Sequence, residues 1–237
     1  MWILFAFGSA VFAGLTAILA KLGIKNIDSN VATAVRTVVV FLFSWMMVLV
    51  VGSYESIANI SGKTMLFLIL SGISTGASWL FYFKALQIGD VNKVTPIDKS
   101  STILTMLLAF IFLNEEITML KFVAMVLIGM GTYLMIQKKE DVAVKTKNNL
   151  WLIYATGSAL FASLTAILGK VGIEGIESNL GTAIRTAVVL IMAWLIVFIT
   201  KKQHTIKNID NKSWTFLILS GFATGGSWSC YYHALQD

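Results

Sequence analysis

The sequence has 237 residues, of which 57% are hydrophobic and 13% are charged, and its formal net charge is +6. A soluble domain carries about 25% charged residues, so this composition excludes an ordinary soluble domain. The basic excess does not indicate nucleic-acid binding, because the lysines form short clusters between apolar runs, as in the cytoplasmic loops of membrane proteins. A single cysteine excludes an intrachain disulfide, and two scattered histidines predict no metal site and no cofactor.

Eight apolar segments follow one another along the chain, each near the roughly 20 residues that cross a bilayer as a helix. Because lipid offers no hydrogen-bond partners to backbone amides, these segments should be helical. The sequence therefore predicts an all-α membrane protein, a polytopic helical bundle of about eight transmembrane helices, with the lipid bilayer as its surroundings. The predicted spans are approximately 3–21, 32–52, 65–86, 95–113, 118–136, 151–169, 181–199 and 214–235.

The fourth predicted span has a marked beginning. Thr95 is expected to cap it, and Pro96 is expected at the first helical position, where a missing N–H costs nothing. Asp98 and Lys99 would then lie in the first turn, where they either face a vestibule or form a simple capping pair.

The chain contains an internal repeat. When it is shifted by 149 residues, 2–88 aligns with 151–237 without a gap, and 44 of the 87 aligned pairs are identical. The stretch LILSGISTGASWLFYFKALQ, for example, returns as LILSGFATGGSWSCYYHALQ. The predicted organisation is a five-helix unit over 1–137, a polar linker over 138–149, and a second unit over 150–237 that contains the first three helices only.

The two copies are predicted to be inverted in the membrane. One unit holds five spans, an odd number, so a second copy would enter from the opposite side. Lys63 is the only basic residue between the second and third spans, whereas the equivalent loop of the second copy carries four lysines. Basic loops mark the cytoplasmic side, so the charges favour an inverted repeat with its N-terminus outside.

Four features carry a resemblance to a known family: GSAVFAGLTAILAK (8–21), the pair Arg36-Thr37, the helix at Leu70–Gln87, and most specifically GDVNKVTPIDKSSTILTMLLAFIFLNEEIT (89–118). Together they make the five-helix unit similar to an EamA domain of the drug/metabolite transporter superfamily. Its members usually contain two inverted copies, ten helices in all, with both termini inside, which leaves the orientation of the N-terminus open. The resemblance implies secondary transport of a small metabolite or drug-like solute across the bacterial cytoplasmic membrane by alternating access.

Two arginines at equivalent positions, Arg36 and Arg185, each lie about a turn and a half inside a predicted span. Arginine at such depth is costly, and inverted-repeat transporters bind substrate near the midplane between their repeats. The pair could therefore bind an anionic group in a central cavity. Alternatively, the side chains extend to the interface or pair with the nearby Asp28 and Glu177.

Aromatic and hydroxyl side chains also recur at equal spacing in the two copies. On each repeated third helix a tryptophan and a tyrosine lie three residues apart on one face. If the two faces meet, they form an aromatic cavity suited to a cation or an aromatic solute; alternatively, they belong to an interfacial belt. These candidate substrate-binding residues are Trp79, Tyr82, Trp228 and Tyr231, with the neighbouring Ser78 and Ser227.

Two functional hypotheses remain open at this point. The first is a transporter of a small-molecule substrate. The second is a non-transporting or incomplete membrane protein, a fragment or an accessory half-transporter that needs a homodimer or another partner chain, because the second unit has three helices only. An intramembrane enzyme is not supported, since neither paired catalytic carboxylates nor metal-ligand spacings are found in the sequence.

Overall fold

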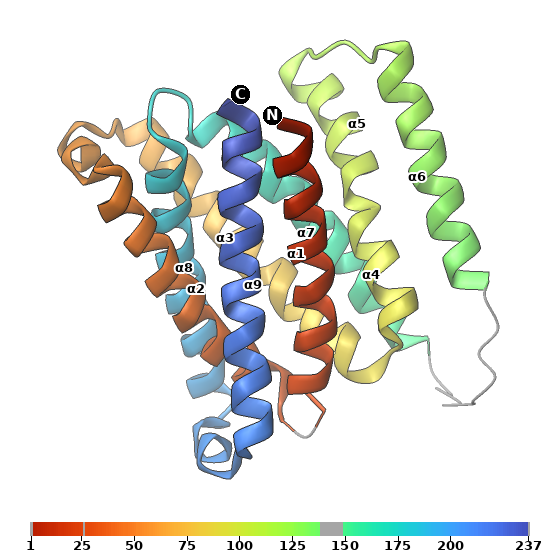
Figure 1. The fold of residues 1–237 in the computed structure, drawn as a ribbon, viewed down its shortest axis with the longest axis vertical. Helices are drawn as coiled ribbons and strands as arrows, with labels where there is room; N and C mark the ends of the chain where they lie inside the picture. Colours follow the sequence, from red (N-terminus) through yellow and green to blue (C-terminus); the bar gives the residue numbers. More distant parts are fainter. Residues whose placement is uncertain (1, 26, 138–148, 237) are drawn as a thin grey trace.

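A computed structural model describes residues 2–25, 27–137 and 149–236, except for the side chains of Trp2, Gln137, Ser229 and 231–236. Within these residues all regular structure is helical (Figure 1). The α-helices are α1 (Trp2–Gly23), α2 (Ser29–Val51), α3 (Gly62–Ile88), α4 (Val91–Lys99), α5 (Ser101–Leu113), α6 (Met119–Gln137), α7 (Leu150–Gly172), α8 (Ser178–Ile199) and α9 (Asn211–Gln236), and the 3₁₀ helices are η1 (Ser53–Asn59) and η2 (Gln203–Asn208).

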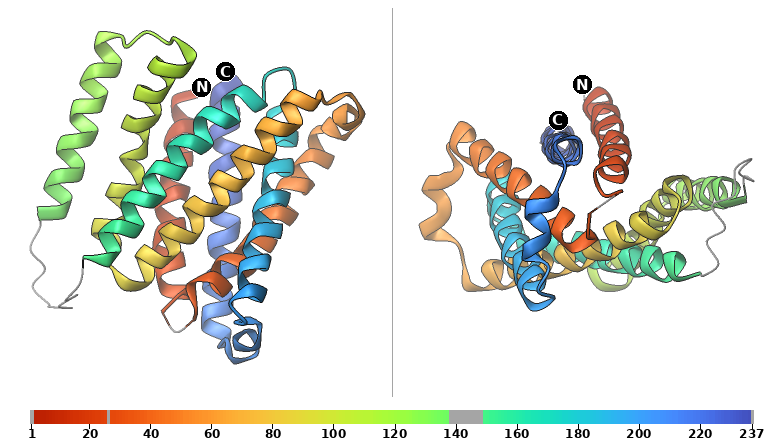
Figure 2. Two further views of the ribbon diagram at one scale, coloured as in Figure 1. Left: turned by 180° about the vertical axis from the view of Figure 1, so that it is seen from behind. Right: turned by 90° about the horizontal axis from the view of Figure 1, so that it is seen from below.

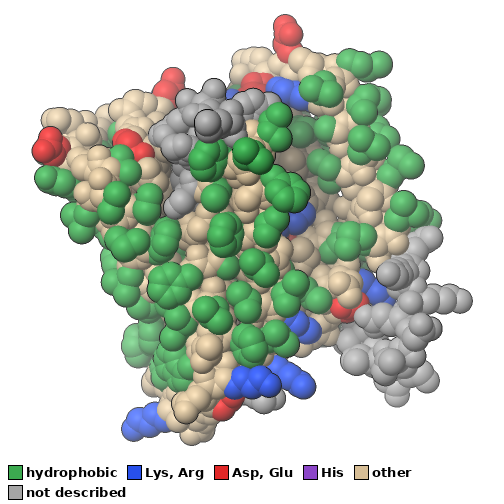
Figure 3. All heavy atoms as spheres, viewed as in Figure 1, with side chains coloured by type: hydrophobic (Ala, Val, Ile, Leu, Met, Phe, Trp, Pro, Cys, Tyr) green, Lys and Arg blue, Asp and Glu red, His purple; other side chains and the backbone are tan. Residues whose placement is uncertain are grey.

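Seven helical segments of the described chain are long and apolar enough to cross a membrane, and α4 with α5 forms one of them. The eighth predicted span corresponds to α9, which is 26 residues long and rich in serine, threonine and glycine. The prediction of an all-α polytopic membrane protein is confirmed, with seven candidate spans and a C-terminal helix. Hydrophobic side chains cover the middle of the visible surface, as expected of a lipid-facing bundle (Figure 3).

The span formed by α4 and α5 differs from its prediction. Asp90 rather than Thr95 caps it, because the Asp90 carboxylate accepts a hydrogen bond of 3.0 Å from the backbone two residues further on. The helix therefore starts earlier and Pro96 lies inside it, where its missing N–H leaves the carbonyl oxygen of Asn92, one turn earlier, without a helical hydrogen bond from position 96. The predicted cap at Thr95 and first-turn positions of Asp98 and Lys99 are wrong. These two residues lie where α4 gives way to α5, inside the span.

The helices of the two sequence copies pack against one another in matched pairs. Helix α1 lies along α9, α3 lies along α7, and α2 lies beside α8, as Figures 1 and 2 show. Glycines allow α3 to approach α8 closely, and α9 to approach α2: a Cβ atom on Gly72 would lie 2.7 Å from Val188 Cβ, and one on the equivalent Gly221 would lie 2.7 Å from Val39 Cβ. Small residues therefore recur where the helices of the two copies meet.

The two ends of the bundle differ in charge, with basic side chains mainly at the bottom and acidic ones mainly at the top of Figure 3. We call the end at which α1 and α8 finish the lysine-rich end, and the end at which α2 and α7 finish the glutamate-rich end. The first carries Lys21, Lys25, Lys93, Lys201, Lys202, Lys207 and Lys212 with Asp28, Asp90 and Asp210, and the second carries Glu55, Glu115, Glu116, Glu174 and Glu177 with Lys63, Lys121 and Lys170.

The packing of the core also differs between the ends. The main buried cluster lies toward the lysine-rich end and includes Ile24, Val31, Phe83, Leu86 and Val94. Toward the glutamate-rich end the buried cluster is small, with Val48, Leu180 and Ala183 as its members. Among the described residues the bundle is thus closed by apolar side chains mainly at the lysine-rich end. The predicted linker lies almost wholly outside the described residues, and the two-unit boundaries and the inversion in the membrane stay predictions.

Candidate functional site

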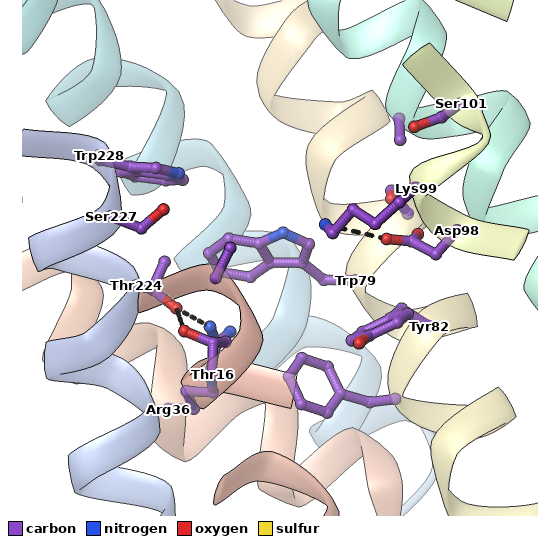
Figure 4. A pocket seen from close by; sticks show the side chains of 14 residues that line it. Thr16, Arg36, Trp79, Tyr82, Asp98, Lys99, Ser101, Thr224, Ser227 and Trp228 are labelled. Atoms are coloured by element: carbon purple, nitrogen blue, oxygen red, sulfur yellow. Dashed lines mark hydrogen bonds and ion pairs between the residues drawn. The ribbon is translucent and has the colours of Figure 1, made fainter. Parts of the chain in front are cut away.

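A cavity of about 200 Å³ lies inside the bundle, between helices of the two copies (Figure 4). Eight of the ten candidate residues from the sequence line it, namely Arg36, Ser78, Trp79, Tyr82, Asp98, Lys99, Ser227 and Trp228. Arg185 lies elsewhere, and the side chain of Tyr231 is outside the described part of the structure. The lining also includes Ala13, Thr16, Phe83, Ser101, Ala162 and Thr224, which sequence reasoning did not select.

The Arg36 side chain is held from several directions. Its Nε donates a hydrogen bond of 2.8 Å to Ser220 Oγ, and its Nη2 donates to Thr224 Oγ1, so both acceptors lie on α9. The guanidinium carbon lies 4.9 Å from the centre of the Trp79 ring and 5.0 Å from that of Phe83. Arg36 is only 2% exposed. Hydroxyl acceptors and ring faces thus compensate the loss of water around this cation.

Asp28 and Glu177, the carboxylates nearest to the two arginines in the sequence, bind backbone N–H groups instead of the arginines. Asp28 accepts a hydrogen bond from the backbone at the start of α2, and Glu177 accepts two at the start of α8. Both therefore cap helices, where a carboxylate meets the positive end of the helix dipole. No ion pair of Arg36 or Arg185 is found among the described residues.

An ion pair marks the junction of α4 and α5. Lys99 Nζ lies 3.2 Å from Asp98 Oδ2, and Ser158 Oγ donates a hydrogen bond of 2.5 Å to the other carboxylate oxygen. The Asp98 side chain is 8% exposed, whereas 62% of the Lys99 side chain is accessible, and Lys99 lines the cavity. Substrate sites of inverted-repeat transporters commonly use interrupted spans of this kind.

The two predicted tryptophans meet in the cavity. The ring centres of Trp79 and Trp228 are 6.0 Å apart, with 34° between the ring planes. In Figure 4 Trp79 lies in the middle of the view, with Arg36 on one side and the ion pair of Asp98 and Lys99 on the other. Tyr82 is 8% exposed and its hydroxyl lies 3.1 Å from Thr95 Oγ1, so it does not belong to an interfacial belt.

Hydroxyl side chains join the copies through matched hydrogen bonds. Ser71 Oγ donates to the carbonyl oxygen of Thr165 at 2.9 Å, and the equivalent Ser220 Oγ donates to that of Thr16 at 3.4 Å. The sequence carried a signal for these contacts, because each hydroxyl residue is identical in both copies although it lies in an apolar span. The same holds for the pairs Ser78 with Ser158, Ser227 with Ser9, Thr75 with Thr165, and Thr224 with Thr16.

Arg185 lines a second, larger pocket of about 610 Å³, which shares Trp228 and Ala162 with the first cavity. The repeat relates the two pockets, because four residues of the second are the equivalents of four residues of the first. These pairs are Ala162 with Ala13, Thr165 with Thr16, Arg185 with Arg36, and Trp228 with Trp79. Unlike Arg36, Arg185 is half-buried, and its Nε has no hydrogen-bond partner among the described residues.

A charged cluster lies where the second pocket reaches the glutamate-rich end. Glu115, in the loop between α5 and α6, pairs with Lys121 at 2.9 Å and with Lys170 of α7. Hydrogen bonds from Lys170 and Lys121 lower the pKa of Glu115 to about 2. The equivalent of Lys170 in the first copy, Lys21, instead donates to the carbonyl oxygens of Leu86 and Gly89 at the end of α3. No cluster of potential metal ligands is found in the described residues.

Membrane-spanning helices around an interior cavity with buried charged groups define the class of the protein as a polytopic membrane transporter. The family model described as the EamA-like transporter family matches residues 1–137 and 149–237. The chain belongs to the EamA-like transporter family, which confirms the resemblance seen in the sequence.

Two curated relatives are transporters by name. The chain is 40% identical over 134 residues to an uncharacterized transporter in the cobO 3' region of Sinorhizobium sp, and the match covers 56% of this chain and 95% of that protein. It is 23% identical over 212 residues to the uncharacterized transporter YxxF of Bacillus subtilis (strain 168), covering 89% of this chain and 66% of that protein.

Proposed function

We propose that the protein is a secondary transporter, which moves a small metabolite or drug-like solute across the bacterial cytoplasmic membrane by alternating access. The observation that carries this proposal is the cavity between the copies, where Arg36 and the pair of Asp98 and Lys99 lie beside the paired tryptophans. Charged side chains inside a bilayer are costly, and they mark solute or ion pathways. The substrate would lie in this cavity, against Trp79 and Trp228.

The difference between the two arginine surroundings supports alternating access. Arg36 is enclosed near the closed, lysine-rich end, whereas Arg185 lines the wider pocket that reaches the glutamate-rich end. Because the two environments are built from equivalent residues, an exchange of their packing would close one end and open the other. In this scheme the lysine-rich end faces the cytoplasm, in agreement with the distribution of basic residues in membrane proteins.

Transport by the full chain in proteoliposomes tests the proposal. A panel of labelled metabolites is offered to vesicles with wild-type protein, with Asp98→Asn, or with Glu116→Gln. Asp98→Asn breaks the ion pair at the junction of α4 and α5 and should lower uptake at least tenfold. Glu116 is exposed on a loop and lines no described pocket, so Glu116→Gln should transport like wild type. The proposal would be rejected if correctly folded wild-type protein transported none of the solutes, either in uptake or in counterflow experiments.

A half-transporter that needs a partner is the second candidate, and the surfaces of α1 and α7 favour it. Helices α4 and α5 cover α7, but among the described helices none covers the equivalent face of α1 to the same extent. Ala6, Ala10 and Gly14 of α1 are exposed, whereas their equivalents Ala155, Ala159 and Ser163 of α7 are buried. The Sinorhizobium relative is also little longer than one five-helix unit. Native mass spectrometry from lipid nanodiscs, combined with the transport assay, distinguishes the two functions. A homodimer supports the half-transporter, and a monomer that transports by itself excludes it.

A further inference from the structure

Arg185 differs from its repeat equivalent at the Nε atom, which has no hydrogen-bond partner among the described residues. The Nε of Arg36 donates to Ser220 Oγ, whereas the Nε of Arg185 is buried without an acceptor among the described residues. The equivalent serine, Ser71, uses its hydroxyl to donate to the carbonyl oxygen of Thr165 at 2.9 Å. A buried guanidinium donor without an acceptor is unfavourable and rare. The Arg185 side chain is therefore free to turn its donors toward an acceptor that enters the pocket.

The pocket of Arg185 is positively charged and of a size suited to a small molecule. Its volume of about 610 Å³ lies within the range of ligand pockets. Three cations, Arg185, Lys121 and Lys170, and one carboxylate, Glu115, line it. Both lysines bind Glu115, so two positive charges remain in excess, and such a pocket concentrates anions.

Neither pocket offers a cationic solute a carboxylate that is free of partners among the described residues. The carboxylate of Asp98 already binds Lys99 and Ser158, and that of Glu115 binds two lysines. Ring faces could also attract a cation, but the guanidinium of Arg36 lies over both Trp79 and Phe83. Trp228 also lines the second pocket and offers an apolar surface to a ligand.

We propose that, in this conformation, the pocket of Arg185 binds the carboxylate or phosphate group of a small organic anion. The planar guanidinium fork suits two oxygen acceptors at once, and Trp228 contacts the apolar part of the ligand. The anion site stands by itself. Only the identification of the bound anion with the transported solute rests on the proposed function, and that solute would pass from this pocket to the adjoining cavity through the shared Trp228.

Ligand-induced stabilisation of the purified full chain tests the site without measuring transport. The protein is placed in phosphatidylcholine nanodiscs, and its thermal unfolding midpoint is followed with benzoate, benzamide, benzylammonium or inorganic phosphate at constant ionic strength. A ligand that binds only the folded state raises the midpoint with concentration. Benzoate should stabilise the wild type, whereas benzamide and benzylammonium should not. Stabilisation by phosphate alone would reject the apolar contact at Trp228.

Variants of Arg185 and Lys63 test whether benzoate stabilises the protein by binding in the pocket of Arg185. Arg185→Gln should weaken apparent benzoate binding at least tenfold, and Arg185→Lys should retain part of it because the charge remains without the fork. Lys63→Gln removes a cation from the same end of the bundle outside both pockets and should bind like wild type. If Arg185→Gln does not fold, the comparison of Arg185→Lys with Lys63→Gln decides.

Three outcomes overturn the assignment: equal stabilisation by benzoate and benzylammonium, undiminished benzoate binding by Arg185→Gln and Arg185→Lys, or stabilisation only when anionic phosphatidylglycerol is added to the nanodiscs. The last result would assign the pocket to a lipid headgroup. Benzoate binding without any transport in proteoliposomes would instead leave the anion site standing and reject the transport function.

Discussion

The surroundings of Arg36 and Arg185 come from equivalent stretches of sequence and yet differ in structure. Arg36 is 2% exposed, donates to Ser220 and Thr224, and lies over two aromatic rings. Arg185 is half-buried, lines a pocket about three times larger in volume, and leaves its Nε without an acceptor among the described residues. Because the hydroxyl acceptors Ser220 and Thr224 have the identical equivalents Ser71 and Thr75 on α3, the difference at the hydrogen-bond acceptors belongs to the conformation and to the neighbouring helices.

The comparison of Arg36 with Arg185 presupposes that the two sequence copies are inverted in the membrane. Cysteine labelling from one side of the membrane should show this inversion as the largest of the expected effects, because equivalent positions would lie on opposite sides. In a Cys230→Ser background, Glu55→Cys in η1 and His204→Cys in η2 place cysteines at exposed, equivalent positions. A membrane-impermeant maleimide added to intact cells should label Glu55→Cys and leave His204→Cys unlabelled until the cells are opened. Labelling of both from outside would contradict the inversion, and the reverse pattern would place the lysine-rich end outside.

Removal of each arginine should affect stability unequally. Arg36→Leu leaves Ser220 and Thr224 without their donor and removes the contacts with two rings, so the free energy of unfolding should fall by about 3 kcal/mol. Arg185→Leu removes a donor that has no acceptor and should lower it by less than about 1 kcal/mol. Unfolding of both variants, compared with wild type in the same lipid nanodiscs, measures the difference, and equal losses would contradict the asymmetry.

Lys21 and Lys170 are a second pair of equivalent residues with different partners, and a smaller effect on stability is expected from them. Lys170 pairs with Glu115, whereas Lys21 donates to carbonyl oxygens at the end of α3. The pKa of Glu115 falls from 4.5 to about 2 on folding, so its stabilising contribution is complete above pH 4.5 and disappears as the pH falls toward 2. The side chain is 32% exposed, so the effect is small.

The advantage of wild type over Glu115→Gln in thermal unfolding should therefore be present at pH 6 and shrink between pH 4.5 and pH 3. Glu116→Gln provides the matched control, because Glu116 is exposed and forms no ion pair with other described residues. A difference between wild type and Glu115→Gln that stays constant from pH 6 to pH 3 would show that this ion pair does not stabilise the fold.

The sequence predicted the helical architecture and most members of the cavity because membrane helices obey a single hydropathy rule and the repeat marks pairs of equivalent residues. It misplaced the start of the span at Thr95, since both Thr95 and Asp90 can cap a helix and only the surrounding packing decides between them. The separation of Arg36 from Arg185 could not be predicted, because similar local sequences acquire different partners through tertiary contacts. The hydroxyl acceptors on α9 were recognisable only as polar residues repeated in apolar spans.

Chemical modification of arginine tests the central claim most directly, because Arg36 and Arg185 are the only arginines in the chain. Phenylglyoxal reacts with accessible guanidinium groups, and peptide mass spectrometry of the protein from nanodiscs reads both sites in one sample. We expect Arg185 to be modified at least ten times faster than Arg36, and benzoate to protect Arg185 selectively. Equal rates of modification, or faster modification of Arg36, would contradict the account.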